Sequence, residues 1–176
     1  MPSTDYIDPE TEHHPTTGTT PSAEWAQIIR DDLEHLVDPP RASVYCDALT
    51  LTDGTLTLLD WTDDDYDTDG WWDGTDEHLV CPTGLGGLYR ISGSAVWTAD
   101  AAEPCDVAIM LEINGTPVES FAEVIAGPGY NSTRIGQSRH WRLIPGDTIG
   151  LVAYRKGSAS VIQLAGARLD LIKVAR

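Results

Sequence analysis

The sequence predicts an all-β fold, an antiparallel jelly-roll sandwich, with one short N-terminal α-helix and a flexible N-terminal arm. From residue 43 onward, apolar and polar side chains alternate along many short segments, which is the period of a half-buried strand. The 16 glycines and 11 prolines supply turns between these segments. With 176 residues, the chain is long enough for one domain with a buried core.

Residues 1–21 are expected to form an acidic flexible arm. They contain Pro, Thr, Asp, Glu and the adjacent pair His13 and His14, without hydrophobic periodicity. A segment of this composition cannot bury enough apolar surface to fold alone. We expect the arm to become ordered only against a partner.

Residues 22–42 are predicted to form an amphipathic helix followed by a proline linker. Ser22 suits the N-cap position, and Asp38-Pro39-Pro40 ends the helix. The helix can cover the open end of the following domain, or it can dock onto a neighbouring subunit or a capsid, and the sequence leaves both interpretations open. The docking face would consist of the apolar side chains Trp25, Ile28, Ile29, Leu33 and Leu36.

Residues 43–176 are predicted to form the jelly-roll trimerisation domain. The strand period is clearest at residues 89–97 and 107–113, where Glu112 is expected to point outward, and Asn114-Gly115 then favours a tight hairpin. Further strands are predicted at residues 44–51, 55–61, 117–125, 134–144, 148–154 and 161–174. The core-facing side chains of the two clearest strands would be Tyr89, Ile91, Gly93, Ala95 and Trp97, and Val107, Ile109, Leu111 and Ile113.

The charge balance disfavours nucleic acid as a partner. The formal net charge is -17, from 28 Asp and Glu against 11 Lys and Arg, so a phosphate backbone would be repelled. The basic residues are mostly arginine, which together with the aspartates fits either a high-GC genome or a halophilic host. No apolar run reaches the length of a membrane helix and no basic-then-apolar leader occurs, so we expect neither a membrane span nor a signal peptide.

The sequence offers no motif for catalysis, and we expect a non-enzymatic protein. Cys46, Cys81 and Cys105 form no CxxC pair and are expected to be small buried hydrophobic residues. No GxSxG elbow or phosphate loop is present. The histidines, including His78 and His140, are scattered, so we expect them to be solvated or to serve packing.

Five segments occur in an order that resembles a known family. YDTDGWWDG is followed by CPTGLGGLYRISGSAVW, AIMLEINGT, WRLIPGDTIGLVAY and LAGARLDLIKV. Within them, Gly87 permits a close approach at the start of a strand, and Pro145-Gly146-Asp147 reverses the chain before an apolar strand. Over residues 43–174 the chain resembles the complement globular-head and tumour necrosis factor-like jelly-roll superfamily, in its bacteriophage or archaeal-virus virion-protein form. Unlike the animal members, it has no collagen G-X-Y repeat before the domain.

The resemblance implies a ten-stranded antiparallel jelly roll that forms a homotrimer. It also implies a structural protein on the virion surface of a tailed virus, such as a capsid decoration, turret or head fibre, bound to the major capsid protein or another virion protein. The arm and helix would provide the attachment. The alternative is a receptor- or glycan-binding module at the tip of a tail fibre, with a host-surface glycan or receptor as partner. A fibre tip normally follows a long shaft, and only 42 residues precede this domain, which favours decoration.

The aspartate-rich stretch before the first clear strand matches the spacing of a calcium loop. Asp65, Asp67, Asp69, Asp73 and Asp76 fall at ligand positions of a twelve-residue loop, with Gly70 at the sixth place. The short Asp76 stands where a bidentate Glu is usual, and the flanking patterns are β rather than helical. Two interpretations remain open, a Ca²⁺ site or a solvated acidic loop, and no other cofactor is indicated.

A surface glycan is a further hypothesis. Asn131 begins the sequon Asn131-Ser132-Thr133 in an expected loop, whereas the other sequon, at Asn114, is already explained by its hairpin.

Overall fold

A computed structural model describes residues 22–99, 105–126, 133–157 and 162–175. The chain divides into two compact units between Pro39 and Pro40. Helix α2 (Ala23–Val37) belongs to the first unit, and Pro40–Ala175 form the second. The predicted arm, residues 1–21, lies outside the described residues.

Helix α2 begins and ends as the sequence predicts. The Ser22 hydroxyl accepts the backbone N–H of Trp25 at 3.1 Å, which is the N-cap bond that satisfies one free donor of the first turn. Glu24 lies in that first turn, where a carboxylate interacts favourably with the helix dipole. No helix in the described ranges is long and apolar enough to cross a membrane.

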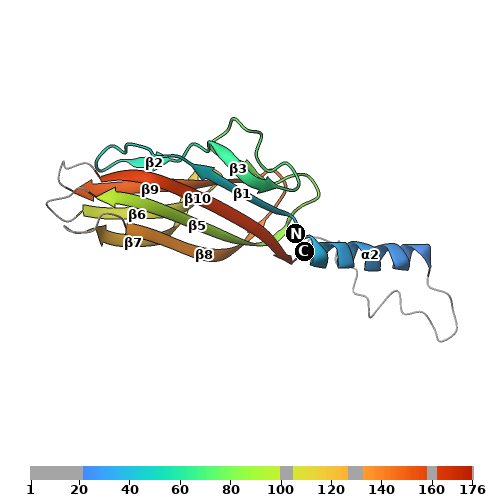
Figure 1. The fold of residues 1–176 in the computed structure, drawn as a ribbon. Coiled ribbons are helices and arrows are strands. Elements are labelled where there is room, and N and C mark those ends of the chain that lie inside the picture. Colours follow the sequence, from blue (N-terminus) through green and yellow to red (C-terminus); the bar gives the residue numbers. More distant parts are fainter. Residues whose placement is uncertain (1–21, 100–104, 127–132, 158–161, 176) are drawn as a thin grey trace. The chain divides into compact units, whose positions relative to one another are not determined.

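The second unit is an antiparallel jelly-roll sandwich, as predicted. Figure 1 shows β1, β10, β5 and β8 side by side, in front of β9, β6 and β7. The first sheet has the order β3 (Asp63–Asp67), β1 (Arg41–Cys46), β10 (Ile162–Ala175), β5 (Gly87–Ala99) and β8 (Thr133–Leu143). The second sheet has the order β2 (Leu56–Leu58), β9 (Thr148–Gly157), β6 (Cys105–Ile113) and β7 (Thr116–Ala126), and the short β4 (Leu79–Val80) also pairs with β9.

The core lies between the two sheets and is built by the predicted alternation. Tyr89, Ile91 and Trp97 of β5 are fully buried, and Val107, Ile109 and Leu111 face them from β6 in the same way. Successive side chains of a strand point to opposite faces, so one parity of each strand fills the sandwich. Cys46 and Cys81 are free thiols in this core, as expected for small hydrophobic residues, whereas the side chain of Cys105 is not described.

Two predicted turns and one predicted close approach are confirmed. Asn114 (φ 52°) and Gly115 (φ 73°) form the two-residue hairpin between β6 and β7, and both need the left-handed conformation. The backbone N–H of Asp147 donates to the Ile144 carbonyl at 3.0 Å, which closes the turn before β9. A Cβ on Gly87 would lie 2.5 Å from the Ala175 carbonyl oxygen, so the close approach predicted there is real.

Three segments differ from the sequence prediction. The strands expected at residues 44–51 and 55–61 are β1 (Arg41–Cys46) and β2 (Leu56–Leu58), so both end earlier than predicted. Asp63–Asp67 was expected to belong to an acidic loop, but it forms the edge strand β3, paired with β1. Aspartate has a low strand propensity, so the sequence pattern does not reveal this strand. Cross-strand partners compensate, because the Tyr45 hydroxyl donates to Asp63 at 3.0 Å and Arg168 forms an ion pair with Asp65. Charged residues also suit an exposed sheet edge, since they oppose pairing with another chain.

Candidate functional site

The loop between β3 and β4 is organised by carboxylates that accept hydrogen bonds from its own backbone. One Asp67 oxygen accepts the N–H groups of Asp69 (3.2 Å) and Gly70 (2.9 Å), and the other accepts the N–H of Trp72 (2.9 Å). Aspartate commonly folds the residues that follow it in this way. Asp67 therefore has a local structural role.

A second turn in the same loop is organised by Asp73. Its Oδ1 accepts the N–H of Thr75 at 2.9 Å, the Thr75 hydroxyl at 3.0 Å and the N–H of Asp76 at 3.1 Å. These bonds stabilise the ionised carboxylate and lower the pKa of Asp73, and the bond from the Thr75 backbone has the largest effect. The same bonds hold the backbone of Asp76 in place.

Two adjacent tryptophans fasten the loop through different contacts. Trp71 is 1% exposed and packs edge-on against Tyr89, with ring centroids 5.0 Å apart and an interplanar angle of 72°. Trp72 is only partly buried, and its indole N–H donates to the Asp76 carbonyl at 2.7 Å. One side chain anchors the loop in the core, and the other holds its far end.

His78 lies where this loop meets the second sheet. Its Nε2 is 2.8 Å from Glu112 Oε1 of β6, and its Nδ1 is 3.5 Å from Asp76 Oδ1. Glu112 leaves the core face of β6 as predicted, but it is not solvated: the residue is 7% exposed, because the loop covers it. A Cβ on Gly150 of β9 would lie 3.1 Å from His78 Cδ2, so a glycine leaves room for the ring.

The predicted calcium ligands have varied partners. Asp65 of β3 forms an ion pair with Arg168, and Asp69 accepts the Thr68 hydroxyl at 2.6 Å. Asp67 and Asp73 fold the loop, as described above. Among the described residues, only Asp76, Glu77 and His78 bring three metal-ligating side chains together, so Asp76 alone of the predicted set belongs to such a group. Calcium binding by the aspartates stays a prediction.

Arginines gather on the outer face of the first sheet. Tyr89 and Ile91 point into the core, so Arg90 between them points outward, and it pairs in register with His140 of β8 and Ile172 of β10. The guanidinium of Arg168 donates to Ser43 Oγ and to Asp170 Oδ1, each at 2.9 Å. This face is rich in arginine, whereas the chain as a whole has a formal net charge of -17. Its described arginines are Arg41, Arg90, Arg142 and Arg168.

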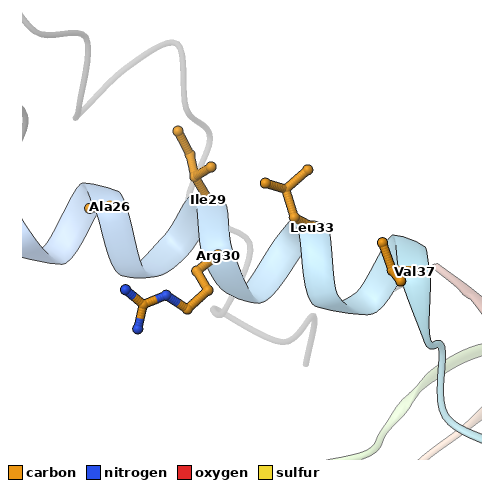
Figure 2. Close-up of a pocket in the computed structure, with 5 residues that line it drawn as sticks. All are labelled: Ala26, Ile29, Arg30, Leu33 and Val37. Carbon is orange, nitrogen blue, oxygen red and sulfur yellow. The ribbon is translucent and has the colours of Figure 1, made fainter.

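The predicted docking helix exposes part of its apolar face. The exposed fractions are 37% for Ile29, 55% for Leu33 and 77% for Leu36, whereas Trp25 and Ile28 are partly buried. Figure 2 shows Ile29 and Leu33 on the same side of α2, with Arg30 on the other. Val37, which the sequence analysis did not include in the docking face, is 84% exposed at the end of the helix. The other predicted interaction residue, Asn131, lies outside the described residues.

Comparison with solved structures bears on the fold. No family model matches the sequence, and no curated protein matches it. The structure is similar to the globular domain of zebrafish complement 1qA protein, with a TM-score of 0.53 and 13% sequence identity, over 78% of this chain and 98% of that domain. The fold is that of the complement globular head. At this level of identity the likeness establishes the jelly-roll topology, as the sequence resemblance implied.

Proposed function

We propose that the protein is a non-enzymatic structural protein of a virion, a homotrimer that decorates the outside of the capsid of a tailed virus. The jelly roll would project outward, and the N-terminal arm and α2 would attach it to the major capsid protein or another virion protein. The observation that carries the proposal is the pairing of a complement globular-head jelly roll with a helix whose apolar side chains are exposed.

The exposed face of α2 supports an attachment role. Leu33 and Leu36 are more than half exposed, and burying a leucine fully contributes about 1.5–3 kcal/mol. A helix that offers such a face as i, i+4 and i+7 anchors fits a hydrophobic groove on a partner. Its three aligned side chains Ile29, Leu33 and Leu36 provide these anchors.

The outer face of the first sheet supports self-association. Its arginines lie on a chain that is otherwise strongly acidic, so the aspartate-rich surface of a second copy has the complementary charge. The same face also carries three aliphatic side chains that are only partly buried, Leu88, Val96 and Ile172. A patch of arginine and aliphatic side chains has the composition of a subunit interface.

The oligomeric state and the partner can be tested separately. Native mass spectrometry of the full chain should give three times the chain mass of 19.1 kDa. Purified protein should also cosediment with expanded capsids that lack it. The same assay with host cells in place of capsids tests the receptor-binding alternative. Binding to host cells without binding to capsids would refute decoration and support the receptor-binding alternative.

Two variants of α2 make the capsid test specific. Leu33→Ala with Leu36→Ala should weaken capsid binding by roughly 100-fold, the equivalent of about 3 kcal/mol of lost apolar burial. Glu24→Gln, on the exposed first turn of the same helix, is the matched control and should bind as the parent does. If all three proteins bind equally, α2 is not the attachment element.

A further inference from the structure

We infer that Asp76, Glu77 and His78 form a binding site for a divalent transition-metal ion of the Zn²⁺ type, which shares only Asp76 with the predicted calcium set. These three consecutive residues each offer one ligand atom, and the three atoms lie within 4.8 Å of one another. One imidazole with two carboxylates is a ligand set that suits Zn²⁺ better than Ca²⁺, which prefers oxygen alone. Asp76 and Glu77 are exposed, so solvent can complete the coordination.

The partner of His78 on the far side of its ring supports this assignment. The Glu112 carboxylate, when ionised, can only accept a hydrogen bond, so the proton of a neutral imidazole lies on Nε2. Nδ1 then presents a lone pair toward Asp76 Oδ1, 3.5 Å away. Two acceptors that face each other in this way are stabilised by a cation between them. Histidine ligands of metals typically donate their other N–H to a carboxylate, and the Nε2-protonated tautomer of His78 would do the same to Glu112.

Surrounding residues hold the backbone of Asp76 and the ring of His78 before any ion binds. The backbone of Asp76 is fixed at its N–H by Asp73 and at its carbonyl by the Trp72 indole. The His78 ring is fixed by Glu112, a residue 7% exposed. Ligands whose positions are set by supporting hydrogen bonds bind a metal with little reorganisation.

Two other occupants would give different results. A proton on Nδ1 would produce an imidazolium between Asp76 and Glu112, with no metal involved. A Ca²⁺ ion held by the aspartates would require Asp69 and not His78. The test therefore has to distinguish a transition metal from a proton and from calcium.

The experiment uses the full chain with His13→Ala and His14→Ala, because two adjacent histidines can bind metal on their own. After treatment with a chelator, the protein is titrated with Co²⁺, followed by its visible absorption bands, and then with Zn²⁺ as competitor. We expect one ion per chain. His78→Ala should abolish binding, and Asp76→Asn and Glu77→Gln should each raise the Kd at least about 10-fold.

Two further variants test the supporting residue and the loop. Glu112→Gln should raise the Kd roughly 10- to 100-fold, since it keeps the shape but weakens the bond to the ring. Asp69→Asn is the matched control in the same loop and should leave the Kd unchanged, because Asp69 does not belong to the group. Circular dichroism checks that each variant is folded.

The inference fails if Co²⁺ and Zn²⁺ do not bind, or if Asp76→Asn and Glu77→Gln leave the affinity unchanged. It also fails if the ¹⁵N signals of the His78 ring respond to pH but not to Zn²⁺, which would assign the position to a proton. Ca²⁺ binding that is lost in Asp69→Asn and kept in His78→Ala would place the ion in the aspartate set instead. None of these measurements depends on the proposed assembly, so their outcome is distinguishable from that of the capsid test.

Discussion

Replacement of Trp71 by alanine tests whether the aspartate-rich loop is part of the core. Trp71 is 1% exposed, and its ring packs on Tyr89 at a centroid distance of 5.0 Å. Truncating a buried tryptophan to alanine costs about 3–5 kcal/mol, and this range includes the loss of the aromatic pair. We expect Trp71→Ala to lower the free energy of unfolding by at least about 3 kcal/mol, a large part of the stability of an ordinary domain.

Trp71→Phe separates the ring from its polar atom. In the described part of the chain, the buried indole nitrogen of Trp71 has no hydrogen-bond partner. An unsatisfied buried donor costs about 1–3 kcal/mol, so removing it offsets part of the lost volume. Phenylalanine also keeps an aromatic ring against Tyr89. The loss for Trp71→Phe should therefore be well below that for Trp71→Ala.

The assay is urea unfolding followed by far-ultraviolet circular dichroism at one fixed protein concentration, because assembly would make the midpoint concentration-dependent. Trp72→Phe is the neighbouring control: it removes the bond to the Asp76 carbonyl and should cost only about 1 kcal/mol. A loss below about 1 kcal/mol for Trp71→Ala would refute the reasoning, since the loop would then contribute little to the core.

Three further predictions concern Gly87 at the start of β5, Asn114 in the hairpin and the buried thiol of Cys81. Gly87→Ala should cost about 1–3 kcal/mol in the same urea assay, because its Cβ would clash with the Ala175 carbonyl. Gly84→Ala is the control: no atom lies within 4 Å of its Cβ, so it should show only the smaller cost of its positive φ. Equal losses in the two variants would contradict the clash. Asn114→Ala should cost about 1–2 kcal/mol, because Asn114 has a left-handed φ and its side chain bonds to the turn before β9. Asn114→Gly should recover only the part of this cost that comes from the backbone conformation. An unchanged urea midpoint in Asn114→Ala would show that the hairpin does not need this residue. Burial raises the pKa of Cys81 to about 11, so stability should fall as pH rises above the unfolded pKa of 9.0, where only the unfolded chain loses the thiol proton. The urea midpoints at about pH 8 and pH 10 should therefore differ less in Cys81→Ala than in the parent. Equal differences in the two proteins would remove Cys81 as the cause.

Much of the fold could be predicted because its signals are local. The alternation in β5 and β6, the positive-φ pair Asn114-Gly115 and the N-cap Ser22 each depend on a few adjacent residues. Such patterns follow from the period of a strand, the conformational freedom of glycine and the free donors of a helix terminus. They are therefore visible in the sequence before any contact is known.

The candidate metal group shows why the rest could not be predicted. His78 and Glu112 are 34 positions apart, and their hydrogen bond exists only because the loop after β3 folds over β6. Each residue taken alone looked ordinary, a histidine ahead of a strand and a glutamate on its outer side. Conversely, the calcium spacing was clear in the sequence, yet its aspartates bond to backbone groups and to Arg168. Spacing along the chain does not show which partner a carboxylate meets.

By itself, the sequence determined the jelly-roll class, the helix, the turns and the acidic character of this protein, because these depend on short-range periodicity and composition. Only the tertiary structure decided that Asp63–Asp67 is an edge strand, that Glu112 is covered, and that arginines share one face of the first sheet. The reason is physical: burial, hydrogen bonding and charge pairing depend on which distant segments meet, and that follows from how the two sheets close over one core.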